Sequence, residues 1–512
     1  DGKQSVTQGF EIEVINVNNP PQIFSYFPTN LNFKINEGNS VKFEVQAYDI
    51  DSNTTLSYQW LLDGMKVSSS TGSGNDSKSS WIYSASYGDY NQKIVKILVS
   101  DGELEDYVRW NITINDASPP TQPTLNTITS PTNISPQVLS GTKEVNTSIW
   151  INGTEVTLFN SSTNWSYSYN LSEGINNISV TSRDAAGNES SAITATIEYD
   201  PNIYVDEANV TGTEDGTKTH PFNTITEGIE IVASGKSVMV AEGTYNEQLI
   251  INKGITLQGA GKESTLISGF EYSGNLITIT ADDVTISGFT IDGKSATDMG
   301  IYSDSSSAIE ISENIIQSHQ DSGIFYQRIS DDCPSGIYVY NNEICFNSQN
   351  GIKVIGAGSG IIESNTIGKN INGIQACNSA SLEVKQNIIN DNISVGILCR
   401  GNSSLLIWGN EITFNDYGIK VGVLSSDTTN PDIGGGVKNG VGQNKIAGNT
   451  THGVSNETTH NIYAKYNWWG DANGPKYPGN NSSGGDWAYW DNVNNKAGAI
   501  IFEDYLTEPQ PF

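Results

Sequence analysis

The feature that most constrains this chain is a short repeat in its C-terminal half. A glycine followed by isoleucine or valine recurs, and each one is followed by an asparagine that precedes another apolar stretch. The glycine and the asparagine are 14 residues apart in five of seven units, and each asparagine lies 8 or 9 residues before the next glycine. A unit of 22–23 residues made of short strands is the length of one β-helix coil. The glycines are Gly300, Gly323, Gly351, Gly373, Gly396, Gly418 and Gly453, and the asparagines are Asn314, Asn342, Asn365, Asn387, Asn410, Asn444 and Asn467.

Stacked coils bring equivalent residues into columns with a spacing of about 4.8 Å. The asparagine column is therefore expected to form a hydrogen-bonded ladder at a turn that tolerates left-handed backbone geometry. Apolar residues after the glycines are expected to stack into an aliphatic core; Ile352, Ile374, Ile397 and Ile419 are examples. The repeat predicts a right-handed parallel β-helix over residues 201–512.

Two units are longer than the others. Gly323 and Asn342 are 19 residues apart, and Gly418 and Asn444 are 26 apart. Both insertions, near 328–334 and 425–440, fall on the same arc of the coil and should project from one face. Loops on one face of a solenoid often mark a binding side. Surface insertions are also tolerated without any function.

Residues 22–117 alternate apolar and polar residues with frequent turn signals, as in a β-sandwich. The motifs Asn36-Glu37-Gly38, Asp49-Ile50-Asp51 and Leu56 to Trp60 resemble the PKD/cadherin-like branch of Ig-like domains, with Trp60 as the core tryptophan. Residues 118–200 read as a second sandwich. Its segment Arg183 to Asn188 resembles the closing hairpin of bacterial and archaeal Ig-like modules, which usually act as spacers.

Residues 1–21 parallel the last strand and linker of the first sandwich, from Asp101-Gly102 to Pro119-Pro120. They are therefore expected to be an orphan Ig-like strand and a linker. Two interpretations stay open. The segment is a remnant of a preceding domain, or residues 8–17 complete a sheet in a neighbouring molecule and link subunits into a filament.

The start of the C-terminal half carries a second resemblance. Ile203 to Asp206, His220-Pro221-Phe222 and Ala241 to Tyr245 resemble the opening of pectin-lyase-like β-helix proteins, and more narrowly the NosD-type carbohydrate-binding repeat group common on archaeal surfaces. The resemblance implies that 225–233 is a short amphipathic helix capping the N-terminal end and that Asn467 to Pro475 closes the other end. The expected fold class is all-β, with two Ig-like sandwiches, a capping helix and a β-helix.

Enzymes of this fold class place a basic residue beside acidic calcium ligands, or cluster two or three carboxylates. The outward positions after the glycines are Lys353, Gln375, Leu398 and Lys420, with few acids among them. The four histidines have no ligand spacing for zinc or copper. We therefore predict no catalytic residues. Glycan binding, or lyase or hydrolase activity at the insertion-bearing face, is the alternative.

A calcium site is predicted at the D-x-D-x-N pattern Asp49, Asp51 and Asn53, with Glu37 or Asp101 joining it, since Ca²⁺ takes six to eight oxygen ligands. The alternative is a polar turn between strands.

Export is inferred from the composition. Asp and Glu number 57 against 26 Lys and Arg, so the net charge of −31 disfavours nucleic acid and anionic membranes as partners. No stretch approaches the ~20 apolar residues of a membrane span. Eighteen N-x-[S/T] sequons predict N-linked glycans and an extracellular location. They are Asn53, Asn75, Asn111, Asn133, Asn146, Asn152, Asn160, Asn164, Asn170, Asn177, Asn188, Asn209, Asn392, Asn402, Asn449, Asn456, Asn480 and Asn481.

Four cysteines in an exported chain are expected to pair. Cys333 with Cys345, and Cys377 with Cys399, are the favoured pairs by position in the coils. Free buried thiols are the alternative.

Taken together, these features predict a structural cell-surface glycoprotein of archaeal type, a subunit of a filament, sheath or surface layer that associates with itself.

Overall fold

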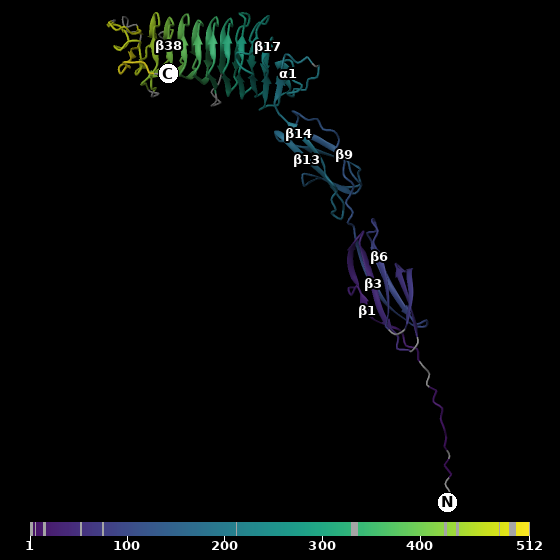
Figure 1. Cartoon of the computed structure of the whole chain (residues 1–512). Coiled ribbons are helices and arrows are strands. Elements are labelled where there is room, and N and C mark those ends of the chain that lie inside the picture. Colours follow the sequence, from purple (N-terminus) through teal and green to yellow (C-terminus); the bar gives the residue numbers. More distant parts are fainter. Residues whose placement is uncertain are drawn as a thin grey trace. The chain divides into compact units, whose positions relative to one another are not determined.

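The computed structural model describes residues 4–5, 7–13, 17–51, 54–73, 76–210, 212–328, 336–423, 427–436, 440–480, 482–490 and 498–510. The chain divides into two compact units. One comprises Asp1–Ser130 and Pro136–Ile197, and the other comprises Pro131–Ser135 and Glu198–Phe512. Almost all regular structure in the described residues is β-strand (Figure 1).

The first sandwich packs a three-stranded sheet, β1-β3-β6, against a five-stranded sheet, β2-β8-β7-β4-β5. Alternate residues of each strand enter the core, where Trp60 and Trp110 are fully buried and Phe43 lies 4.9 Å from Trp110, ring centre to ring centre. The prediction of Trp60 as the core tryptophan is confirmed. The strands are β1 (Gln22–Phe27), β2 (Asn32–Asn36), β3 (Ser40–Tyr48), β4 (Thr55–Leu62), β5 (Met65–Ser73), β6 (Ser77–Ser84), β7 (Gln92–Ser100) and β8 (Glu105–Asn115).

The second sandwich has a four-stranded sheet, β11-β10-β13-β14, and a two-stranded sheet, β12-β9. Leu139, Ile149, Trp165 and Val180 are buried between them. The strands are β9 (Gln137–Thr142), β10 (Thr147–Ile151), β11 (Thr154–Asn160), β12 (Asn164–Tyr169), β13 (Gly174–Arg183) and β14 (Ile193–Tyr199).

The C-terminal unit is a coil of three parallel sheets. Each turn from β16 to β42 adds one strand to each sheet, and the end turns add strands to one or two of the sheets. The twelve-stranded sheet contains β15 (Ile203–Val205), β16 (Ser237–Val240), β19 (Thr256–Gly259), β22 (Val284–Ser287), β25 (Ile309–Ser312), β28 (Ile337–Tyr340), β31 (Ser359–Glu363), β34 (Ser381–Lys385), β37 (Ser404–Trp408), β40 (Asp432–Gly434), β43 (Ile462–Ala464) and β45 (Ile500–Ile501). The nine-stranded sheet contains β17 (Gly243–Tyr245), β20 (Thr265–Ser268), β23 (Thr290–Asp292), β26 (Ile315–Gln317), β29 (Glu343–Cys345), β32 (Thr366–Gly368), β35 (Ile388–Asn390), β38 (Glu411–Thr413) and β41 (Lys445–Ala447). The ten-stranded sheet contains β18 (Leu249–Ile251), β21 (Ile277–Ile279), β24 (Ile301–Asp304), β27 (Ser322–Arg328), β30 (Asn350–Gly356), β33 (Asn372–Cys377), β36 (Val395–Cys399), β39 (Tyr417–Val421), β42 (His452–Asn456) and β44 (Ala488–Trp490).

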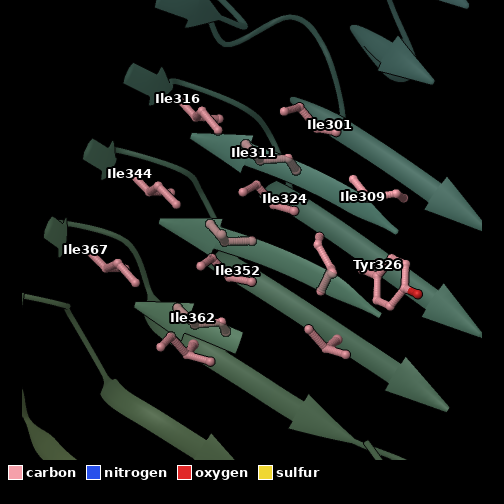
Figure 2. Close-up of a cluster of buried hydrophobic side chains, with 14 of the residues drawn as sticks. Ile301, Ile309, Ile311, Ile316, Ile324, Tyr326, Ile344, Ile352, Ile362 and Ile367 are labelled. Atoms are coloured by element: carbon pink, nitrogen blue, oxygen red, sulfur yellow. The ribbon is translucent and has the colours of Figure 1, made fainter. Parts of the chain in front are cut away.

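The interior of the coil is a stack of isoleucine columns (Figure 2). Ile352, Ile374, Ile397 and Ile419 lie in register on successive strands and are fully buried, as the repeat predicts. Burial of a branched aliphatic side chain contributes about 1.5–3 kcal/mol, so each coil is held to the next mainly by this column packing.

The predicted asparagine ladder is present between the twelve-stranded and nine-stranded sheets. Each side-chain amide from Asn314 to Asn444 donates to the carbonyl oxygen of the next asparagine at 2.8–3.2 Å, ending at Asn467. The left-handed turn residue is the one before the asparagine, for example Asn341 (φ 57°) and Ser364 (φ 55°). The turn therefore has the left-handed geometry that the sequence predicts.

A short helix, α1 (Ile225–Ile231), begins beside β15 at the N-terminal end of the coil. Thr224 caps it by accepting from the amide of Glu227, and Ile225, Gly228 and Ile229 are buried. The helix lies within the predicted segment 225–233. No helix in the described part of the chain has the length and apolar character of a membrane span.

Candidate functional site

The candidate site is a groove on the outer surface of the twelve-stranded sheet. Side chains alternate between the core and the outside along each strand, and parallel strands in register align the outward ones. The outward column of five successive coils is Glu310, Tyr338, Ile361, Glu383 and Leu406. These residues line a hollow of about 680 Å³.

Small residues where these strands begin leave room for the hollow. Ala308, Gly336, Ser359 and Ser381 line it at that edge. Added Cβ atoms on Gly336 and Gly360 would collide with the backbone carbonyl groups of Ser359 and Ile337. Both glycines are therefore required by the close approach of adjacent coils. This edge follows the ten-stranded sheet. The first insertion falls here in the sequence, but residues 329–335 lie outside the described residues. Most of the second insertion follows β40 and therefore lies at the opposite edge of the twelve-stranded sheet, which corrects the expectation that both insertions share one arc.

A second outward column, two residues further along each strand, supports the first. It contains Ser312, Tyr340, Glu363, Lys385 and Trp408. The rings of Tyr338 and Tyr340 stack with centres 4.5 Å apart and planes at 27°. The stack orients the ring of Tyr338 at the groove.

Hydrogen bonds fix both tyrosines and the tryptophan. The Tyr338 hydroxyl donates to Glu363 at 3.0 Å, and the Tyr340 hydroxyl donates to Glu310 at 2.5 Å. The indole N–H of Trp408 donates to Glu383 at 2.9 Å. Each carboxylate therefore orients one aromatic ring.

The tyrosines remain protonated under ordinary conditions. Burial, followed by the bond to Glu363, raises the pKa of Tyr338. The bond to Glu310 is the main cause that raises the pKa of Tyr340. Both hydroxyls therefore stay hydrogen-bond donors to the carboxylates.

The groove carboxylates are spread along four coils. Glu310 and Glu383 lie three coils apart, about 14 Å at the strand spacing, which exceeds the separation of glycosidase acid pairs. Glu363 and Glu383 share the ammonium group of Lys385, at 3.5 and 3.7 Å. The arrangement can accept hydrogen bonds from a polar ligand whose apolar face lies on Tyr338, Ile361 and Leu406.

This groove is not predicted from the sequence. The outward residues after the glycines, which were the candidates there, lie on the ten-stranded sheet. There Lys353 lies over the ring of Phe325, Lys420 pairs with Glu457 at 2.9 Å, and Gln375 is buried. The available signal was the position four residues before each ladder asparagine from Asn314 to Asn410, which is occupied by Glu310, Tyr338, Ile361, Glu383 and Leu406.

The predicted calcium residues are only partly brought together. Asn18 Nδ2 donates to Asp101 and the amide of Asn19 donates to Asp51, so both acids hold the same linker at one end of the first sandwich. Asp49 accepts the amide of Asp51, and its Oδ2 is buried with no hydrogen-bond partner. Asn53 lies outside the described residues. Among the described residues, no group of three or more His, Cys, Asp or Glu side chains is placed to hold a metal ion.

Glu37 does not join the set that contains Asp49. It accepts the amides of Gly88 and Ala117, at the turn that precedes β7 and the end of β8. Hydrogen bonds from Ser118 and Gly88 lower the pKa of Glu37 to about 2. The prediction that Glu37 joins the calcium ligands is wrong, because Glu37 precedes β3 and Asp49 follows it, so the two residues lie toward opposite ends of that strand.

The expected bridge between Cys377 and Cys399 is also wrong. Cys345, Cys377 and Cys399 are free buried thiols. Cys399 lies opposite Ala376, so Cys377 is one position further along its strand, and neighbours on a strand point to opposite faces. The expected bridge between Cys333 and Cys345 is wrong as well, because Cys345 is a free thiol; Cys333 itself lies outside the described residues.

The sequons fall into groups by exposure. Asn392, Asn449 and Asn456 are at most 7% exposed, and each amide nitrogen donates inside the coil, for example from Asn392 to Asn415 at 3.0 Å. A glycan on any of these nitrogens is incompatible with the fold, which corrects those three assignments. Asn111, Asn146, Asn152, Asn164, Asn170, Asn177, Asn402 and Asn480 are exposed, and Asn133, Asn160, Asn188 and Asn209 are half-buried. Asn53, Asn75 and Asn481 lie outside the described residues.

Family models and solved structures are similar to parts of this chain. Residues 274–433 match the family model of the right handed beta helix region, and residues 208–262 match a protein family of unknown function, DUF1565. The C-terminal half is a right-handed β-helix. Fibronectin(III)-like modules of Clostridium thermocellum CbhA are 10% identical, with a TM-score of 0.17, over 35% of this chain and 94% of that one. A GH87 α-1,3-glucanase of Streptomyces thermodiastaticus is 12% identical, with a TM-score of 0.35, over 71% of this chain and 87% of that one.

Two curated relatives are similar over part of the chain. The uncharacterized protein YwoF of Bacillus subtilis is 39% identical over 133 residues, which is 22% of this chain and 28% of that protein. A cell surface glycoprotein of Methanothermus fervidus is 30% identical over 151 residues, which is 28% of this chain and 25% of that protein. Each match thus covers about a quarter of the relative's length.

Proposed function

We propose that this chain is a structural glycoprotein of the cell surface in which Ig-like sandwiches carry a β-helix. The observation that carries the proposal is the group of exposed sequons on the second sandwich: Asn146, Asn152, Asn164, Asn170 and Asn177. N-linked glycans are attached to exported proteins. The similarity to a cell surface glycoprotein supports the same location.

The mechanical character of the β-helix fits a structural role. Its core is one continuous apolar cluster from Ile203 to Ile500, and buried asparagine ladders join the coils. A solenoid of this kind gains stability from every coil interface. The result is a rigid element that sandwich spacers can present.

Self-association into a filament, sheath or surface layer is the assembly that we propose. Residues 7–13 belong to no strand and expose Phe10 and Ile12, at 82% and 85% of their surface. An extended segment with alternating apolar residues pairs readily with a free sheet edge. Donation of residues 8–17 to a neighbouring copy is one way to link subunits.

The test is electron microscopy of the native material, combined with mass spectrometry of its glycopeptides. The expected result is a regular filament or lattice, with glycans on the five sequons of the second sandwich. Unmodified sequons together with dispersed single particles would contradict the proposal. Fibres that still form from a chain without residues 1–18 would contradict strand donation alone.

A further inference from the structure

We propose that the groove of the twelve-stranded sheet binds an uncharged polysaccharide chain lying parallel to the axis of the coil. The groove is linear because it repeats one outward position over five coils. Five strands at about 4.8 Å spacing give it a length of about 19 Å. A linear groove of this kind suits a linear polymer better than a compact ligand.

The groove presents a preformed stacking surface. Tyr338 is 36% exposed, and Tyr340 supports its ring from behind. The hydroxyl groups of both rings are held by carboxylates, so little side-chain freedom is lost when a ligand binds. Ile361 and Leu406 extend the apolar surface along the same column. Sugar rings have apolar faces that pack on such surfaces.

The polar groups of the groove match the hydroxyl groups of a sugar. A carboxylate has two oxygens and about four acceptor positions. Glu310 and Glu383 use one oxygen each for Tyr340 and Trp408. The remaining positions can accept hydroxyl hydrogens of a bound sugar, and hydrogen bonds to charged acceptors are stronger than neutral ones.

Charge selects against acidic polymers. Glu310, Glu363 and Glu383 surround the groove, and Lys385 is the cation that pairs with two of them. The whole chain carries a net charge of −31. Uronic acid polymers, sulfated glycans and nucleic acids are therefore repelled, whereas an uncharged glycan is not.

The experiment is affinity electrophoresis of the whole chain in gels that contain one polysaccharide each. The uncharged probes are a soluble β-glucan, a mannan and a xylan, and polygalacturonate is the acidic probe. We expect at least one uncharged polymer to retard the protein and polygalacturonate to leave it unretarded. Retardation by polygalacturonate alone, or by none of the four, overturns the proposal.

Two variants connect binding to the groove. Tyr338→Ala removes the stacking ring and is expected to weaken binding about tenfold or more. Tyr167→Ala on the second sandwich is the matched control, because Tyr167 is 37% exposed, and it should bind like the original chain. Equal binding by the Tyr338→Ala and Tyr167→Ala proteins overturns the assignment to the groove.

Glu383→Gln is a second variant that tests binding at the groove if Tyr338→Ala folds poorly. It keeps the size of the side chain but removes the charged acceptor, so binding should weaken while the thermal unfolding temperature stays close to that of the original chain. Unchanged binding by this variant contradicts the role of the carboxylate. Sedimentation measured beside the binding assay tests a second copy as the occupant: dimers that Tyr338→Ala dissociates would overturn the proposal.

Discussion

The side-chain amide of Asn365 donates to Oδ1 of Asn387 at 3.0 Å, and the same Oδ1 accepts the backbone amide of Asn365 at 2.9 Å. One carbonyl oxygen thus satisfies two donors of the preceding coil. In the same way, Oδ1 of Asn365 accepts both the backbone amide and the side-chain amide of Asn342. Both members are buried, so every link of this ladder replaces hydrogen bonds that water would otherwise make.

Asn365→Ala is expected to lower the free energy of unfolding by about 3 kcal/mol. The change removes the five hydrogen bonds of the Asn365 side chain at once, and each unpaired buried group costs about 1–3 kcal/mol. Asn342 would lose the acceptor for both its backbone and side-chain amides. Denaturant unfolding measured by circular dichroism checks the value.

Asn252→Ala is the control for this substitution. Asn252 is an exposed asparagine of the same β-helix, so its loss should change the free energy of unfolding by less than about 0.5 kcal/mol. Equal effects of the two substitutions would show that the ladder adds nothing to stability.

The sequence predicted the first ladder because its period is regular, but a second ladder escaped notice. Asn347, Asn370, Asn392, Asn415 and Asn449 each follow a residue of the first ladder by five positions, and they bond from coil to coil. Asn392 and Asn449 also fit the sequon pattern, which hid their structural role. The constant offset of five was the signal available in the sequence.

Other features could not be predicted because they depend on register between distant strands. Glu37 and Asp49 flank the same strand, β3, and therefore lie toward its two ends. The groove depends on which residues five separate strands place outward, and no single segment shows it.

His319 is expected to make the β-helix less stable at mildly acidic pH. It replaces an asparagine at the head of the second ladder, fully buried, with Nδ1 2.8 Å from the hydroxyl of Thr297. Burial lowers the pKa of His319 from 6.5 to about 4. The unfolded chain therefore binds a proton more readily, so stability is intact above pH 6.5 and falls as the pH drops toward 4.

The expected loss is about 3 kcal/mol between those limits, since each pKa unit corresponds to about 1.36 kcal/mol. His319→Asn restores the ladder residue and should remove this part of the pH dependence. Urea unfolding of both proteins at pH 7 and pH 4 measures how much the free energy of unfolding changes with pH in each. The carboxylates and His452 are present in both proteins, so their contributions cancel in the difference. Identical pH profiles would refute the role of His319.

Glycosylation should follow exposure within the folded chain. Asn164→Gln is expected to remove the mass of one glycan, because Asn164 is exposed on β12. Asn392→Gln should leave the glycan mass unchanged and lower stability by about 2–3 kcal/mol, since the buried amide loses its bonds to Ile367 and Asn415. Intact mass spectrometry and thermal unfolding of protein from a glycosylating host check both results. A glycan on Asn392 would contradict the buried ladder.

The sequence predicts that calcium stabilises the first sandwich through Asp49 and Asp51, whereas no three acids among the described residues are placed to hold a metal ion. Asp49 is 3% exposed, and its Oδ2 has no partner, an arrangement that is costly for a carboxylate. Asp51 accepts the backbone amide of Asn19, and Asp101 accepts the side-chain amide of Asn18, so both acids have partners in the linker. A hard cation that prefers oxygen ligands would satisfy the free oxygen of Asp49.

Calorimetry in 1 mM calcium and in excess chelator tests this expectation. The unfolding temperature of the first sandwich should rise in calcium by about 4 °C or more, the shift expected for 1 kcal/mol in a domain of this size. Asp49→Asn should abolish the shift, whereas Glu155→Gln, an exposed acid on β11 of the second sandwich, should preserve it. Equal unfolding temperatures in calcium and chelator would favour the alternative, a polar turn at Asp49, Asp51 and Asn53. The free-energy cost of burying Oδ2 of Asp49 would then be offset by the packing of Trp60 and its neighbours.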